Sequence, residues 1–99
     1  MSGKYFHVYM LASGKRGTIY IGVTSDLLSR VIQHKDHLFP KSFTAKYEVT
    51  RLVWYEAHDS AETAIRRERQ LKEWRRAWKV ELIQKANPTW RDLWEDFTL

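Results

Sequence analysis

The chain has 99 residues, a common size for one domain, and 43% of them are apolar, with five Trp, five Tyr and four Phe to fill a core. It has no cysteine, which excludes disulfides and zinc-thiolate sites and leaves His, Asp and Glu as the available metal ligands. Seventeen Lys and Arg against twelve Asp and Glu give a net charge of +5, and the isoelectric point of about 9.6 favours a phosphate-bearing partner, although charge alone would also suit a small soluble protein.

No segment has the features of a targeting or membrane-spanning sequence. Residues 1–11 lack the long apolar run and the small-residue cleavage site of a signal peptide, and no stretch approaches the length that spans a membrane. There is no internal repeat and no linker. The sequence therefore predicts a single domain over residues 1–99, located in the cytoplasm and without membrane contact.

Two strands are predicted near the amino terminus. Residues 5–11 are aromatic and apolar, and residues 18–23 are rich in β-branched and aromatic types. Between them, residues 12–17 contain two glycines and suit a hairpin loop, so the strands should pair antiparallel.

A symmetric hairpin loop also predicts a register. If Leu11 lies opposite Thr18, then Tyr9 lies opposite Tyr20, and the next pair of this kind sets His7 opposite Gly22. The two phenols of Tyr9 and Tyr20 would then share one face of the sheet.

A helix is predicted from Asp26 to Lys35, with Thr24 or Ser25 as its cap. Arg30 and His34 lie one turn apart on its polar side and should project together. Its predicted core face consists of Leu27, Leu28, Val31 and Ile32. The following residues, 37–48, lose this periodicity and include Pro40, two lysines and three aromatic residues, so we expect a basic loop that contains Lys41, Lys46, Phe39, Phe43 and Tyr47.

A third strand over residues 52–55 would complete the sheet, and a long helix follows it. Asp59 can cap this helix with Glu62 three residues later, as in a capping box. Glu68 falls on its apolar stripe, and the exposed side carries Arg66, Arg67, Arg69, Lys72, Arg75 and Arg76. A further helical segment covers residues 78–85 and stops at Pro88. Asn87 and Pro88 open a short terminal helix that packs through Trp90, Leu93, Trp94 and Phe97.

Five polar residues from separate elements could together carry phosphodiester hydrolysis. That reaction needs an activated water, a cation near the scissile oxygens and stabilisation of the leaving oxygen. Tyr9, Tyr20, Arg30, His34 and Glu68 supply these chemical types.

Each of these residues also has a purely structural interpretation. Glu68 could form a salt bridge with one of the nearby arginines, because a carboxylate on an apolar stripe must be compensated. Strand tyrosines are commonly core residues, and a single surface histidine such as His34 is ordinarily inert. A zinc site formed by His34 and His37 is a weaker alternative, because no second pair of strong ligands occurs at suitable spacing.

The spacing of the residues favours the functional interpretation. His7-Val8-Tyr9 is followed, after ten intervening residues, by Tyr20-Ile21-Gly22 and then by Arg30 and His34. This pattern resembles the signature of the GIY-YIG endonuclease superfamily. The resemblance covers nearly the whole chain and extends through residues 43–47, 67–74, 82–83 and 87–88. The chain is similar to small stand-alone bacterial proteins related to the amino-terminal nuclease domain of the excinuclease C subunit.

The resemblance implies an α+β fold with a small three-stranded antiparallel sheet flanked by helices. It also implies a single Mg²⁺ or Mn²⁺ ion bound by Glu68, with no small-molecule cofactor. By position, Tyr9 and Tyr20 match the tyrosines of the two half-signatures, and Arg30 matches the arginine that contacts phosphate. His34 matches a histidine found in several branches, Gly22 matches the glycine that keeps the strand end open, and Asn87 matches a late asparagine. His7 departs from the pattern, because the family has glycine at that place.

These observations predict a metal-dependent DNA endonuclease that acts in DNA repair or processing. Branched and damaged DNA are candidate substrates, and we expect a monomer that could act with a protein partner. Contact with nucleic acid is expected at Gly22, Lys41, Lys46, Arg66, Arg69 and Asn87. The alternative is a nucleic-acid-binding module of the same fold that cuts slowly or not at all.

Overall fold

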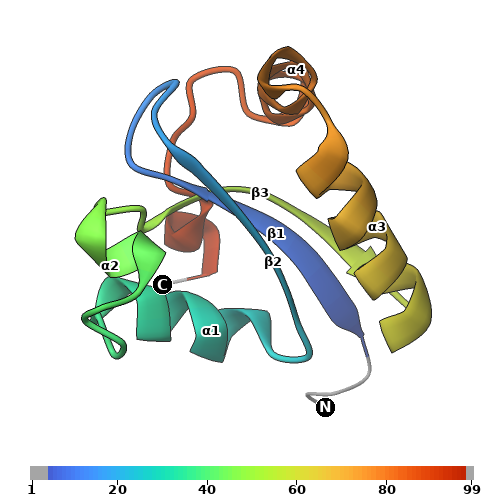
Figure 1. The fold of residues 1–99 in the computed structure, drawn as a ribbon, viewed down its shortest axis with the longest axis horizontal. Helices are drawn as coiled ribbons and strands as arrows, with labels where there is room; N and C mark the ends of the chain where they lie inside the picture. The colour runs from blue at the N-terminus through green and yellow to red at the C-terminus, as the bar shows by residue number, and fades with distance from the viewer. Residues whose placement is uncertain (1–4, 98–99) are drawn as a thin grey trace.

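A three-stranded antiparallel sheet forms the centre of the computed structural model, which describes residues 5–97 (Figure 1). Strands β1 (Phe6–Ala12), β2 (Ile19–Thr24) and β3 (Arg51–His58) lie in the order β2-β1-β3, so β2 and β3 are the edge strands. The helices are α1 (Leu27–Lys35), α2 (Phe43–Lys46), α3 (Ala61–Glu73) and α4 (Arg76–Ala86), and a 3₁₀ helix η1 (Leu93–Phe97) ends the described chain. The predicted α+β fold is confirmed.

The alternation of β1 produces two cores, one on each face of the sheet. Val8, Met10 and Ala12 face one side and pack with buried residues of α3 and α4. Tyr9 and Leu11 face the other side and pack with α1 and the segment around η1. Figure 1 shows α3 and α1 on opposite sides of the sheet. The side chains that the sequence grouped as Tyr9, Tyr20 and His34 therefore lie on the α1 side.

The predicted hairpin register is wrong by two residues. Tyr9 pairs with Gly22 and Leu11 pairs with Tyr20. The cause is the loop, which is tighter than a symmetric six-residue loop because the Ser13 amide donates to the Thr18 carbonyl at 3.0 Å. A shift of two preserves the face of every side chain, so the two phenols share one face as predicted, with their ring centroids 6.2 Å apart.

Two predicted helix caps are also wrong. Asp26 itself caps α1, and its side chain accepts a hydrogen bond from the Ser29 amide. Ser60, not Asp59, caps α3 by accepting from the Thr63 amide. In α1, Leu27 and Val31 are buried as expected, but the predicted core residues Leu28 and Ile32 are each 43% exposed.

The predicted basic loop over residues 37–48 contains a short helix, α2. Ser42 caps it by accepting from the Ala45 amide, and its buried side consists of Thr44 and Ala45. Most of the remaining residues of the segment are exposed, including both of its lysines, Lys41 and Lys46, while His37 and Ser42 are half-buried.

The segment after α4 covers the outer edge of β3. The Asn87 side-chain amide donates to the carbonyls of Val53 and Arg91, at 3.1 and 2.9 Å. The Asp92 carboxylate accepts from the Leu52 amide and also forms an ion pair with Lys35 of α1. The edge strand thus finds partners for polar backbone groups that would otherwise be open to pairing with another chain. No helix within residues 5–97 is both long enough and apolar enough to cross a membrane.

Candidate active site

The site is organised by the close approach of the Tyr9 phenol to Gly22. Tyr9 is 1% exposed, and a Cβ atom placed on Gly22 would lie 2.5 Å from the Tyr9 hydroxyl and 2.6 Å from its Cζ. Only glycine leaves room for the phenol at this place in β2. Because β2 is an edge strand, the Tyr9 hydroxyl is directed across it toward the edge of the sheet.

His34 connects the Tyr9 hydroxyl to α2. Its Nε2 atom lies 3.2 Å from the Tyr9 hydroxyl, and its Nδ1 atom lies 2.9 Å from Thr44 Oγ1. Thr44 is 3% exposed, and its Oγ1 lies 3.2 Å from the Ser42 hydroxyl. The chain of polar contacts Tyr9–His34–Thr44 fixes the imidazole at both nitrogens, so its orientation is determined by groups from three elements.

Burial keeps the Tyr9 phenol and the His34 imidazole uncharged. The pKa of Tyr9 is raised well above its ordinary value, chiefly by desolvation and next by the neighbouring Tyr20, while the charge of Arg30 acts in the opposite direction. The pKa of His34 is lowered by burial and then by Arg30. Tyr9 is therefore a protonated phenol beside a neutral His34, and the direction of the two hydrogen bonds follows from which imidazole nitrogen carries the proton.

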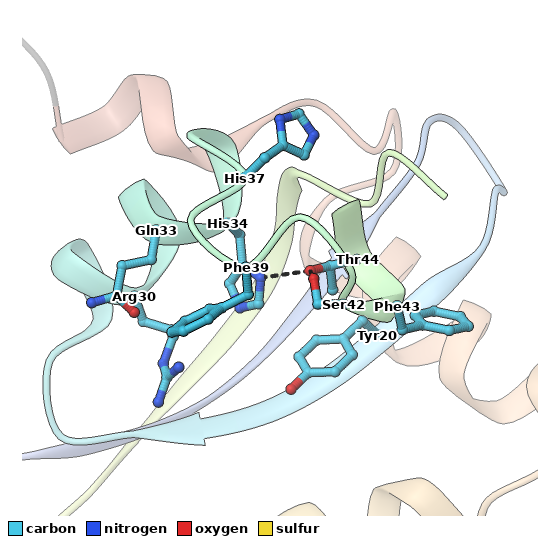
Figure 2. A pocket seen from close by; sticks show the side chains of 9 residues that line it. All are labelled: Tyr20, Arg30, Gln33, His34, His37, Phe39, Ser42, Phe43 and Thr44. Carbon is cyan, nitrogen blue, oxygen red and sulfur yellow. Dashed lines mark hydrogen bonds between the residues drawn. The ribbon is translucent and has the colours of Figure 1, made fainter. Parts of the chain in front are cut away.

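A hollow of about 160 Å³ lies beside this chain. Figure 2 shows Tyr20, Arg30 and His34 around it, with the Arg30 guanidinium and the Tyr20 hydroxyl ending on the same side. The Tyr20 ring lies 5.4 Å from the His34 ring, centroid to centroid. The other lining residues are Gln33, His37, Phe39, Ser42, Phe43 and Thr44. The structure thus brings together three of the five predicted catalytic residues at one surface hollow, with Tyr9 behind His34.

Glu68 lies on a different element from the residues that line the hollow. It lies on α3, between the buried residues Ala64 and Leu71, which pack on the opposite face of the sheet. It does not line the hollow, but its charge contributes to raising the Tyr9 pKa, so it lies within electrostatic reach of the phenol. Its carboxylate is 14% exposed and lies 2.7 Å from the Lys72 ammonium, so its salt bridge is with a lysine rather than with an arginine.

The donor groups fit Mg²⁺ or Mn²⁺ and do not fit a structural zinc ion. Magnesium is usually held by one or two carboxylates together with phosphate oxygens and waters, and Glu68 offers one such carboxylate. Zinc would need a cluster of nitrogen, sulfur or oxygen ligands. Within residues 5–97, no group of three or more His, Cys, Asp or Glu gathers to supply one, and His37 instead lies 3.4 Å from Glu48.

The predicted nucleic-acid contacts divide into two groups. Lys41, Lys46, Arg66 and Arg69 are exposed, although Arg66 lies 3.9 Å from the Glu62 carboxylate and Lys46 lies over the Tyr47 ring. Gly22 and Asn87 are buried and serve the fold instead. Gly22 makes space for Tyr9, and Asn87 is 3% exposed with its amide occupied by backbone groups of the terminal segment and of β3.

His7 lies outside the hollow. Its ring packs edge-on against the Tyr55 ring, with the two ring centroids 6.1 Å apart. The pKa of His7 is lowered by burial and by the nearby His58. Its Nδ1 atom is buried without a hydrogen-bond partner. The bulk that histidine adds in place of the family glycine is thus accommodated beside Tyr55 and does not narrow the space around Arg30.

Sequence reasoning missed the residues that α2 contributes. Thr44 contacts His34, and Phe43 lines the hollow together with Phe39, which precedes α2, whereas the sequence predicts only a basic loop here. The available signal was Ser42, a good cap residue followed by four residues without glycine or proline.

Comparison with known proteins agrees with the sequence pattern. The family model described as the GIY-YIG catalytic domain matches residues 5–81. Proteins named UPF0213, from Yersinia pestis strain Pestoides F and from Yersinia pseudotuberculosis serotype O:1b, are each 31% identical to this chain over 83 residues. The matched region is 84% of this chain and 85% of each relative. No solved structure matches the chain.

Replacing Gly22 tests the close approach. In Gly22→Ala, the new methyl group collides with the Tyr9 ring, and we expect a loss of about 1–3 kcal/mol in the free energy of unfolding. Urea denaturation measures this loss. Gly14→Ala is the matched control, because no atom lies within 4 Å of the added Cβ and stability should not fall. Equal stability of the two variants would show that Tyr9 does not need the space.

The lowered pKa of His34 predicts a dependence of stability on pH. Above the ordinary histidine pKa of 6.5, both the folded and the unfolded protein hold the ring neutral. As the pH falls below 6.5, the unfolded chain takes up a proton that folded His34 does not accept until lower pH, so stability declines. Denaturation curves at pH 7.5, 6.5 and 5.5 should show a shallower decline for His34→Gln than for the wild type. Gln33→Ala, which alters the same hollow without removing a titrating group, should retain the wild-type slope.

Proposed function

The chain belongs to the GIY-YIG catalytic domain family, a family of nuclease domains, and we propose that it is a metal-dependent endonuclease that hydrolyses phosphodiester bonds in DNA. The observation that carries this proposal is the convergence of Tyr20, Arg30 and His34 on one hollow, with Glu68 within electrostatic reach. A phosphate group placed there would meet a guanidinium, a phenol and an imidazole at once.

Arg30 is the residue suited to hold the scissile phosphate. Its planar guanidinium offers paired donors that match phosphate oxygens, and it borders the hollow beside His34 (Figure 2). Arg30 lies one turn before His34 on α1, and both side chains line the hollow while Leu27 and Val31 of the same helix are buried. Arg30 would stabilise the negative charge that increases on the phosphate during the reaction.

The burial of Tyr9 assigns different roles to the two tyrosines. Tyr9 is closed off from solvent and its raised pKa keeps it protonated, so it serves to position His34 rather than to accept a proton from water. Tyr20 is half-buried and borders the hollow, where its phenol oxygen, as the phenolate, would accept a proton from the attacking water while solvent supplies the proton that the leaving oxygen takes up. As the water oxygen bonds to phosphorus, the bond to the leaving oxygen breaks.

Glu68 is the residue that would hold the divalent metal. A bound Mg²⁺ or Mn²⁺ supplies Lewis-acid stabilisation of the charge on the leaving oxygen. Lys72 is 53% exposed, so its ammonium can leave the carboxylate for solvent without breaking a buried contact. The Glu68 side chain itself is only 14% exposed, which restricts the positions that its carboxylate can take.

Exposed cations on two sides of the site would bind the DNA backbone. Lys41 and Lys46 lie on the segment around α2, and Arg66 and Arg69 lie on α3. Each phosphate contact displaces counterions, so this surface would give affinity that depends on salt but carries little sequence information.

A second candidate function is a binding module that retains the fold but not the reaction. The pairing of Glu68 with Lys72 favours this candidate, because the carboxylate already has a cationic partner. We further propose one domain over residues 1–99 in the cytoplasm, from the length and the lack of targeting features in the sequence. The protein would be a monomer that a protein partner could assist, with a substrate in DNA repair or processing.

Replacement of Glu68 tests the metal assignment. Glu68→Gln should lower the rate of cleavage in Mg²⁺ or Mn²⁺ by more than about 100-fold, because a bound metal supplies several kcal/mol and each 1.4 kcal/mol is tenfold in rate. DNA affinity and the unfolding midpoint should change little. Lys72→Ala is the matched control: it removes the same ion pair but leaves the carboxylate, so cleavage should persist. If the two variants lose stability equally and both cut normally, Glu68 serves only the ion pair.

Replacement of Arg30 separates catalysis from binding. Arg30→Ala should reduce single-turnover cleavage by about 100- to 1,000-fold, since it removes a donor to the reacting phosphate. Equilibrium binding of the same DNA should weaken only modestly, because other cations contribute to it. Arg30→Lys should recover part of the rate, because lysine keeps the charge and loses the paired donors. Equal losses in both assays would make Arg30 an ordinary backbone contact, and absence of cleavage by the wild type would favour the binding module.

A further inference from the structure

Exposed aromatic and aliphatic side chains are concentrated on the segment that leads into α2. Leu38, Phe39, Phe43 and Tyr47 are 55%, 58%, 48% and 48% exposed within ten residues of sequence. Single exposed hydrophobic residues are normal on a protein surface, so the informative ones are those that also border the proposed site. The fold gives no reason for their exposure, because α2 buries only Thr44 and Ala45.

Two of these rings open onto the proposed catalytic hollow. Phe39 and Phe43 line it together with Tyr20, Arg30 and His34 (Figure 2). Phe43 already packs on Tyr47, with ring centroids 4.8 Å apart, and the Lys46 ammonium lies 5.5 Å from the centre of the Tyr47 ring. No ring of residues 5–97 stacks on Phe39, so at least one face of it is available to a ligand.

The size of the hollow and the charged residues around it indicate which ligand the Phe39 ring would contact. The hollow of about 160 Å³ is smaller than the ~300–1,000 Å³ of pockets that enclose drug-sized molecules, so it holds one phosphate group rather than a whole nucleotide. Phe39 is 58% exposed, so its ring is open to a base that lies next to that phosphate and outside the hollow. Lys41 and Lys46 on the same segment and Arg30 at the rim supply positive charge for the phosphates on either side. Aromatic side chains interleaved with cations are the combination that binds single strands, by stacking and by charge.

A stacking ring beside the scissile phosphate restricts the kind of DNA that fits. In a continuous duplex, both faces of each base are covered by its neighbours, so a protein ring can stack only on a base that is unpaired or turned out of the helix. Given the proposed nuclease function, on which this inference rests, we propose that the site takes an unpaired nucleotide and that Phe39 stacks on the base next to the phosphate held by Arg30. The substrate class is therefore single-stranded DNA or the single-stranded part of a branched DNA.

The test measures binding without cleavage. Affinities of the wild type, Phe39→Ala, Phe39→Trp and Leu38→Ala are measured in EDTA for a labelled single strand and for the blunt duplex of the same strand. Loss of one stacked base should weaken single-strand binding by Phe39→Ala about 5- to 150-fold and leave duplex binding unchanged. Phe39→Trp retains a ring and should bind as the wild type does. Leu38→Ala is the matched control, equally exposed and adjacent but outside the hollow, and it should have no effect.

A strand with abasic nucleotides completes the test. It keeps the phosphates and removes the bases, so the wild type should lose affinity for it, and Phe39→Ala should lose nothing more. Equal losses for single strand and duplex, no loss in Phe39→Ala, or an equal loss in Leu38→Ala would each overturn the proposal. Absence of cleavage by the wild type in Mg²⁺ or Mn²⁺ would overturn the nuclease function alone, because the binding difference does not depend on the reaction.

Discussion

The burial of the Tyr9 phenol against Gly22 is the constraint on which the site depends. A phenol with 1% exposure needs a polar partner for its hydroxyl, because an unpaired buried hydroxyl is costly. His34 supplies that partner from α1, and Thr44 of α2 completes the contact on the other side of the imidazole. One buried group thereby fixes the sheet, the first helix and the short helix relative to one another, and the hollow forms where they meet.

The same burial separates the groups that stay neutral from the groups that carry charge. Tyr9 and His34 are uncharged because desolvation raises the pKa of the phenol and lowers that of the imidazole. Arg30 and Glu68 lie farther out, on α1 and α3, where water or counter-charges can reach them. A site with an uncharged, rigid interior and charged residues at its rim suits a phosphate. The charged residues contact the phosphate oxygens, while the buried residues hold the side chains around them in a fixed orientation.

The two covered faces of the sheet explain why the site lies at an edge. Tyr9 and His34 belong to the α1 side, whereas Glu68 comes from the helix that covers the other side. For Glu68 to act on the same ligand as these residues, as proposed, the ligand must lie where the sheet ends, and β2 is the edge strand that Tyr9 crosses. The other edge, along β3, is closed by Asn87 and Asp92 of the terminal segment, so the two edges have different uses.

The sequence by itself determined the three strands, the longer helices, their order and the shared face of Tyr9 and Tyr20, because periodicity and side-chain alternation are local properties of the chain. It could not determine the register, the caps at Asp26 and Ser60, or the helix at Phe43–Lys46, because each depends on which of several adequate hydrogen-bond partners wins in the folded protein. The spacing of the sequence motifs also gave no reason to assign different roles to Tyr9 and Tyr20. Only the tertiary structure distinguished them, because burial is set by contacts between residues far apart in sequence, and it is burial that keeps Tyr9 protonated behind His34 while Tyr20 faces the hollow.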